Sequence, residues 1–175
     1  MALRTIHKDE YARKGCNHKG IRYHHAEHAR WSELWTILGM DFEYRPRKHE
    51  VTIPMTGRYK RGEEDDTLWY SPSFYLPGMD IFVDIKKEPP KPESTYIAGD
   101  LFRITGIPVV MFQGPMFVPN WTTLSPRATF CREKPSPQPY YLQFDGRLFR
   151  ISPNTNESDV LHPRLMEAFS QALQI

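Results

Sequence analysis

Apolar side chains recur along this chain at two spacings, one typical of helices and the other of strands. Residues 26–38 show the helical spacing, and Gly39 follows where a helix commonly ends. A second helix is predicted over residues 94–105, and residues 161–173 form a closing amphipathic helix. The apolar face of the first helix is formed by Trp31, Leu34, Trp35 and Leu38.

Shorter apolar segments, bounded by turn residues, predict strands. Pro77-Gly78 and Asp145-Gly146 are typical of tight turns, so each predicts a hairpin between its neighbours. The order of helices and strands predicts an α/β fold with a mixed sheet flanked by helices. The predicted strands lie at residues 42–44, 50–53, 69–76, 81–86, 107–112, 140–144 and 148–151.

Proline is the outlier of the composition, because 16 of 175 residues, about 9%, are proline where about 5% is usual. Several lie among aromatic residues in an irregular segment, residues 114–139, which is a candidate loop for binding a protein partner. We interpret the aromatic side chains there, Trp121 among them, as a satellite core. Residues 1–22 are interpreted as a polar lead-in, and residues 23–175 as one domain containing that segment.

Net charge and hydropathy limit the kinds of partner and location that the protein can have. The net charge of +2, from 23 basic and 21 acidic residues, predicts at most a local basic patch for nucleic acid. The longest apolar run, residues 107–112, is far shorter than the roughly 20 residues of a membrane-spanning helix, so we expect no membrane partner. No signal peptide is readable, and two cysteines, Cys16 and Cys131, favour a reducing, cytoplasmic location.

Glu27 stands out in the first predicted helix, because it lies four residues before Trp31 and therefore on the apolar face. A carboxylate there needs a partner, a metal or a cleft, since an unpaired buried charge is unfavourable. Two explanations are open. Glu27 is either a functional carboxylate or a helix-start glutamate stabilised by the helix dipole and paired with Arg30 or His28.

The predicted strand over residues 81–86 carries a second polar pair. Strand alternation places its three aliphatic side chains on one face and Phe82, Asp84 and Lys86 on the other. Asp84 and Lys86 either form a salt bridge near a strand end, or they serve phosphodiester hydrolysis. In the second case Asp84 holds a divalent cation while Lys86 assists the attacking water.

Histidines around the start of the first helix offer a further alternative, because histidine and cysteine are ligands of zinc. No C-x-x-C pair accompanies them, so we favour solvated, helix-capping or phosphate-facing histidines. The residues concerned are Cys16, His18, His24, His25 and His28.

Taken in order, these features resemble the PD-(D/E)XK nuclease superfamily, in particular its small phage and bacterial members. Those proteins carry four motifs in order along the chain. The first is E-A-R-W on a helix, the second is Y-x-P-D-F-x-L-P, the third is a hydrophobic residue followed by E-x-K, and the fourth is T-G-x-P. The resemblance spans roughly residues 22–113. Its segments here are Glu27-His28-Ala29-Arg30-Trp31, Pro72-Ser73-Phe74-Tyr75-Leu76-Pro77, Asp84-Ile85-Lys86 and Thr105-Gly106-Ile107-Pro108.

The resemblance implies a restriction-endonuclease-like fold and a DNA endonuclease that uses magnesium, or manganese in its place. By it, Glu27 and Asp84 are metal ligands and catalytic carboxylates, the Ile85 carbonyl is a further ligand, and Lys86 is the catalytic lysine. The chain departs from the family at Ser73, which stands where the family has the aspartate of P-D. A neutral hydroxyl is a poor magnesium ligand. A phage-encoded member would act in the cytoplasm of a bacterial host.

Basic residues between the first helix and the candidate site predict contacts to phosphate, with a strongly salt-dependent affinity. An ordinary solvated charged hairpin is the alternative, and the acidic run over residues 63–66 would oppose a polyanion. Interleaved aromatic residues can stack on unpaired bases. They are Tyr44, Tyr59, Trp69 and Tyr70. The basic residues are Arg45, Arg47, Lys48, Arg58, Lys60 and Arg61.

Two hypotheses of different class follow. In the first, the protein is a metal-dependent DNA endonuclease, and a homodimer is one expected state, because duplex cutting usually needs two active sites. In the second, the catalytic site has decayed, and the scaffold is a DNA- or protein-binding module with an inhibitory or structural role. Ser73 divides the two hypotheses, because it removes a carboxylate from the site.

Overall fold

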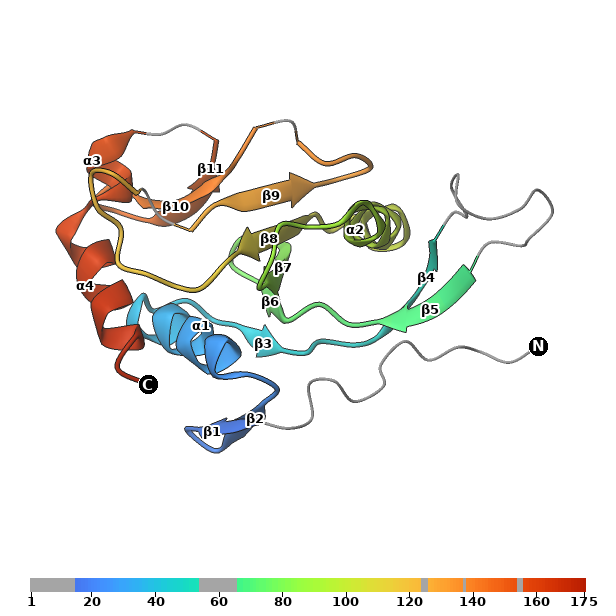
Figure 1. Cartoon of the computed structure of the whole chain (residues 1–175), viewed down its shortest axis with the longest axis horizontal. Coiled ribbons are helices and arrows are strands. Elements are labelled where there is room, and N and C mark those ends of the chain that lie inside the picture. Colours follow the sequence, from blue (N-terminus) through green and yellow to red (C-terminus); the bar gives the residue numbers. More distant parts are fainter. Residues whose placement is uncertain (1–14, 54–65, 124–125, 137, 154–155) are drawn as a thin grey trace.

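A computed structural model describes residues 15–53, 66–123, 126–136, 138–153 and 156–175. It confirms the predicted α/β class, with a five-stranded mixed sheet and helices on both of its faces (Figure 1). In spatial order the sheet contains β3 (Glu43–Tyr44), β6 (Phe74–Leu76), β7 (Ile81–Lys86), β8 (Val109–Gln113) and β9 (Ala128–Cys131).

The remaining elements are helices and two-stranded ribbons. The helices are α1 (Ala26–Ile37), α2 (Pro92–Thr105), α3 (Glu157–Val160) and α4 (Pro163–Ala172). The ribbons pair β1 (Cys16–His18) with β2 (Ile21–Tyr23), β4 (His49–Ile53) with β5 (Asp66–Tyr70), and β10 (Tyr141–Phe144) with β11 (Phe149–Ser152).

The centre of the sheet is built from β6, β7 and β8. The predicted turn at Pro77-Gly78 joins β6 to β7 as an antiparallel hairpin, in which Phe74 lies opposite Val83. Strand β7 pairs in parallel with β8, and α2 makes the crossover between them. Strand β7 therefore has a hydrogen-bonded neighbour on each side, which holds its side chains in fixed positions.

The core has two parts, one on each face of the sheet. Helices α1 and α4 cover the first face, where Val83 packs in a large cluster that includes Trp31 and Phe169. Helix α2 and strand β4 cover the other face, where Phe82 packs against Leu101. Neighbouring residues of β7 thus point into different clusters, which confirms the alternation predicted for this strand.

Several predicted boundaries are corrected. The segment over residues 69–76 is two strands, because Pro72 lacks the backbone N–H that a continuous ladder needs. The lead-in contains the β1–β2 ribbon, which packs on α1. Residues 114–139 are not irregular throughout, since β9 forms the edge of the main sheet next to β8. No described helix is long and apolar enough to cross a membrane.

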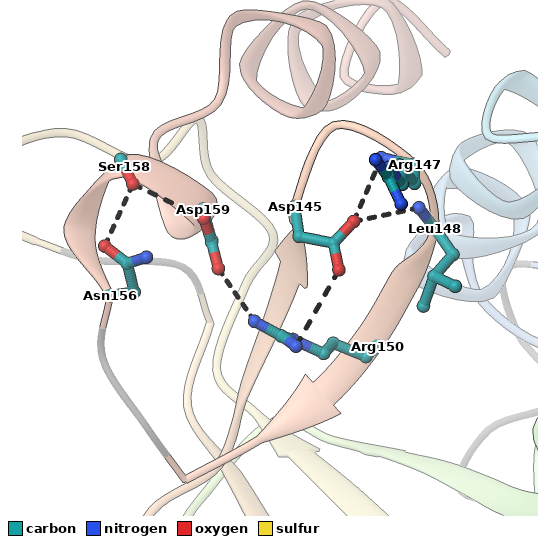
Figure 2. Close-up of polar contacts among 7 residues, drawn as sticks. All are labelled: Asp145, Arg147, Leu148, Arg150, Asn156, Ser158 and Asp159. Carbon is teal, nitrogen blue, oxygen red and sulfur yellow. Dashed lines mark hydrogen bonds and ion pairs between the residues drawn. The ribbon is translucent and has the colours of Figure 1, made fainter.

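An ion-pair network fastens α3 to the β10–β11 ribbon (Figure 2). The guanidinium of Arg150, on β11, donates a 2.8 Å hydrogen bond to Asp159 of α3 and lies 3.8 Å from Asp145 in the hairpin turn. Asp145 accepts hydrogen bonds from the backbone N–H groups of Arg147 and Leu148. Arg150 thereby joins the turn of the ribbon to the short helix.

Candidate functional site

A cavity of about 200 Å³ lies where α1, the end of β5 and the end of β7 meet. Asp84 is the one carboxylate in its described lining, whereas several histidines and basic side chains surround it. The lining residues are His24, His25, His28, Arg45, Tyr70, Ser71, Pro72, Ser73, Asp84, Ile85, Lys86 and Lys87. A second cavity, of about 320 Å³, shares His25, His28, Ile85, Lys86 and Lys87 with the first. We call the two together the cleft.

Asp84 lies at the centre of a hydrogen-bond network and is only 5% exposed. Its Oδ1 accepts a 2.8 Å hydrogen bond from the Ser73 hydroxyl. Its Oδ2 accepts a hydrogen bond from the Tyr70 hydroxyl and lies 2.6 Å from the Lys86 ammonium. Both carboxylate oxygens therefore have protein partners.

Strand register explains why Ser73 meets Asp84. Phe74, the first residue of β6, pairs with Val83 across the β6–β7 hairpin, so Ser73, which directly precedes β6, faces Asp84. The Ser73 hydroxyl also accepts a 3.2 Å hydrogen bond from the backbone N–H of Ile85. One hydroxyl thus satisfies a buried carboxylate and a backbone donor of β7 at once.

The network sets the charge of its members. Burial opposes ionisation of Asp84, but Lys86, Tyr70 and Ser73 outweigh it and hold the pKa of this carboxyl below its usual value. Burial, reinforced by the charge of Asp84, raises the pKa of Tyr70 well above its usual value. At neutral pH the site therefore contains an ionised carboxylate and a neutral phenol, with Lys86 in contact with the carboxylate.

His28 is a neutral member of the same cleft. Burial lowers its pKa to about 4, although Asp84 acts in the opposite direction. Its Nδ1 lies 3.1 Å from the Tyr44 hydroxyl, and its Nε2 lies 3.4 Å from the Ser73 hydroxyl. His28 therefore connects α1 to the residue that faces Asp84.

Glu27 lines the second cavity rather than the first. Its side chain is 20% exposed, with Oε1 2.6 Å from Arg30, as one of the two sequence interpretations expected. Its Oε2 accepts a 3.1 Å hydrogen bond from the backbone N–H of Met116. Glu27 thus faces the cleft from α1, while it also fastens the segment after β8 to that helix.

The predicted basic residues do not all reach the cleft. Arg45 lines it and contacts His24, whereas Arg47 and Lys48 are exposed and outside its described lining. Lys87, which was not singled out from the sequence, lines both cavities. The other predicted basic residues, Arg58, Lys60 and Arg61, lie outside the described residues.

Magnesium is the ion that the resemblance implies. In their present arrangement, the carboxylates of Asp84 and Glu27 do not form a suitable set of ligands for it. Every carboxylate oxygen of the two residues already faces a protein donor or cation. The third ligand position is occupied by Ser73, whose neutral hydroxyl is a poor magnesium ligand. This hydroxyl donates a hydrogen bond to Asp84. Lys86 supplies the positive charge that this buried carboxylate requires.

The zinc alternative also lacks a common centre in the described part of the chain. His18 pairs with Glu33 at 2.8 Å on the β1–β2 side of α1, whereas His28 faces Tyr44 and Ser73. Among the residues that the structure describes, no group of three or more His, Cys, Asp and Glu side chains is arranged to hold a metal ion.

Besides Lys87, sequence reasoning missed the roles of two residues of the site. Tyr70 was interpreted as an aromatic residue for base stacking, yet its hydroxyl is bound to Asp84. Its position two residues before Pro72 in the family pattern was the available signal. His28 was interpreted as one of a histidine group or as a partner of Glu27, and nothing in the sequence indicated its contact with Ser73.

Comparison with known proteins finds no matching family model, no matching curated protein and no matching solved structure. The resemblance to the PD-(D/E)XK superfamily therefore stays a prediction from the motifs.

Proposed function

We propose that the cleft binds the phosphate backbone of a nucleic acid, DNA in the first instance, without hydrolysing it. The observation that carries the proposal is the charge balance of the cleft. Arg45 and Lys87 add positive charge at its wall. The charge of Asp84 is compensated by Lys86, and that of Glu27, in the second cavity, by Arg30. Phosphate oxygens are the partners that such a set of donors and cations favours.

The binding test uses fluorescence anisotropy of labelled single-stranded and duplex 20-mers over a range of salt concentrations. Lys87→Ala should weaken binding and lower the salt dependence by about one released counterion. Lys91→Ala is the matched control, because Lys91 is exposed just before α2 and outside the described lining of the cleft. Equal effects of the two variants, or no binding by the wild type, would contradict the proposal.

Metal-dependent phosphodiester hydrolysis is the second candidate. It is favoured by Glu27, Ile85 and Lys86, which line one cavity although they come from α1 and β7. Plasmid, single-stranded and branched DNA are incubated with Mg²⁺ or Mn²⁺, with Asp84→Ala as the control. We expect no cleavage. Cleavage that disappears in the variant would reverse the order of the two candidates and show that another group completes the metal site.

The remaining predictions about partners and location accompany either candidate. A protein partner at residues 114–139 and a homodimer stay predictions. Under this proposal we expect the protein to act in a reducing cytoplasm, in which the free thiols of Cys16 and Cys131 are stable.

A further inference from the structure

Trp121 is 77% exposed, the largest exposed fraction among the large hydrophobic residues that the structure describes. Its assignment to a satellite core is therefore wrong, although Phe112 in the same sequence region is fully buried. Tryptophan is enriched at binding interfaces, because its large apolar ring can be covered by a ligand while its N–H stays hydrated.

A hydrogen-bonded turn holds Trp121 in place. The side-chain carbonyl of Asn120 accepts hydrogen bonds from the N–H groups of Thr122 and Thr123, at 3.0 and 2.9 Å, and from the Thr122 hydroxyl at 2.7 Å. The backbones of Asn120 and Thr123 also bond to each other in both directions. Trp121 lies inside this turn, so its backbone position is set by the turn while its indole stays accessible to a ligand.

Trp121 lines a third cavity, of about 610 Å³, which continues the cleft. Lys87 and Gly114 belong to both the second and the third cavity. The backbone N–H of Gly114 donates a 2.9 Å hydrogen bond to the carbonyl of Lys86, which fixes the junction. We call the three cavities together the groove.

The far wall of the groove is built by Tyr141 of β10 and Glu157 at the start of α3. The Arg150 network described above fastens α3 to the β10–β11 ribbon, and so holds this wall (Figure 2). The third cavity thus lies between the end of β7 and a braced ribbon and helix.

The charged side chains around Trp121 indicate which kind of ligand the third cavity favours. Lys87 and Arg127 line the third cavity, and both are exposed, against one acidic residue in the lining, Glu157. The neighbours Thr122 and Thr123 are polar, so the indole is not the centre of a broad apolar patch such as a protein partner would cover. Three aromatic residues line the described part of this cavity, Phe117, Trp121 and Tyr141, and of these Trp121 alone is exposed. One exposed indole beside cations matches a nucleobase with its phosphates.

We propose that Trp121 is a stacking platform for an unpaired base, so that the groove receives a single strand whose phosphates contact Arg127 and Lys87. This inference rests on the proposed nucleic-acid binding and adds the substrate class. Duplex bases have both faces covered by their neighbours and cannot stack on the indole without unpairing.

The test uses intrinsic tryptophan fluorescence, because Trp31 and Trp35 are fully buried and only Trp69 and Trp121 are exposed. Titration with an unlabelled 12-mer of deoxythymidine should quench the emission of the wild type and of Trp69→Ala, but not of Trp121→Ala. Affinity should fall about 5- to 100-fold in Trp121→Ala, the range expected for one lost base stack.

Three controls sharpen the test. Trp69→Ala removes the other exposed indole, which is 51% exposed and lies outside the described lining of the groove, and its affinity should stay within about twofold of the wild type. Trp121→Phe retains an aromatic face and should keep most of the affinity. A duplex 12-mer of matched length should bind at least about tenfold more weakly than the single strand.

The outcomes separate this inference from the proposed function. Unchanged affinity in Trp121→Ala, with weakened affinity in Lys87→Ala, would overturn the stacking platform and leave the phosphate-binding cleft intact. Equal loss of single-strand and duplex affinity in Trp121→Ala would also overturn it, because the indole would then not contact a base. No binding of any oligonucleotide by the wild type would overturn both.

Discussion

The hydroxyl of Ser73 donates a 2.8 Å hydrogen bond to the Oδ1 of Asp84 across the β6–β7 hairpin. In the superfamily that the motifs resemble, an aspartate occupies the position of Ser73, and its carboxylate would face Asp84 in this register. Two carboxylates in contact repel each other unless a cation lies between them. With serine, the same contact becomes attractive without a cation.

Ser73→Asp should therefore make the protein depend on a divalent cation. Without metal the variant should be less stable than the wild type, because a second negative charge is placed against the buried Asp84. Mn²⁺ or Mg²⁺ should raise its Tm, by an amount equivalent to about 3 kcal/mol at a concentration 100-fold above the dissociation constant. Differential scanning calorimetry with and without metal measures the effect.

Ser73→Asn is the matched control, because it has nearly the same size as aspartate and no charge. It should show no metal-dependent change in Tm, and neither should the wild type. A metal-induced stabilisation of the wild type comparable with that of Ser73→Asp would show that the present donors already form a cation site, against our conclusion.

Lys86→Met tests how far the ammonium stabilises Asp84. The variant leaves a buried carboxylate with only the Tyr70 and Ser73 hydroxyls as partners. The free energy of unfolding should therefore fall by about 1–3 kcal/mol, less than the roughly 3–5 kcal/mol of a fully buried pair, because the Lys86 side chain is 28% exposed. Urea unfolding at pH 7 measures it. The double variant Asp84→Asn/Lys86→Met should recover part of the lost stability, because it removes the unpaired charge. A double variant less stable than both Asp84→Asn and Lys86→Met would contradict this account.

His28 makes stability depend on pH. Its pKa is about 4 in the folded protein and about 6.5 in the unfolded chain, so the unfolded chain binds a proton first as the pH falls. The free energy of unfolding should therefore decrease from pH 6.5 to pH 4, by up to about 3 kcal/mol from this residue. Above pH 6.5 its contribution is complete and constant.

Urea midpoints at pH 7.5 and 4.5 measure this slope. Burial also lowers the pKa of His25 and His49, so the comparison of His28→Gln with the wild type isolates His28. The variant should lose less stability on acidification than the wild type. Identical slopes in the two proteins would show that His28 is not the residue responsible.

Gly99→Ala tests the packing of α2 against the segment after β9. Alanine normally stabilises a helix relative to glycine by about 1 kcal/mol. A Cβ at position 99 would lie only 2.8 Å from the backbone carbonyl oxygen of Glu133, which cannot move as a side chain does. We therefore expect a net loss of about 1–3 kcal/mol in the free energy of unfolding.

Gly78→Ala is the comparison for that substitution, because nothing lies within 4 Å of a Cβ at position 78 and its φ is not positive. It should leave the urea midpoint nearly unchanged. A Gly99→Ala protein as stable as the wild type would mean that α2 packs less closely than the structure shows.

Local pattern was sufficient for most elements of the fold. The spacing of Trp31, Leu34 and Trp35 predicted α1 and its buried face, and all three side chains are fully buried. The Pro77-Gly78 turn predicted the hairpin that aligns β6 with β7. Strand β9 was missed, because its residues lie in a proline-rich stretch and its ladder is formed with a strand about twenty residues earlier.

The candidate site divides in the same way. Sequence alone determined that Asp84 and Lys86 share one face of a strand, since side chains alternate at every residue. It also singled out Glu27, because the apolar spacing of α1 placed this carboxylate near the core. These inferences need only the geometry of one element.

Tertiary structure decided what these groups contact. The Tyr70 hydroxyl reaches Asp84 only because the β4–β5 ribbon packs where it does, and Glu27 meets the backbone of Met116 across 89 residues of sequence. The exposure of Trp121 likewise depends on how residues after β8 pass the end of β7. Contacts between distant segments depend on the packing of whole elements, which the periodicity of one segment does not contain.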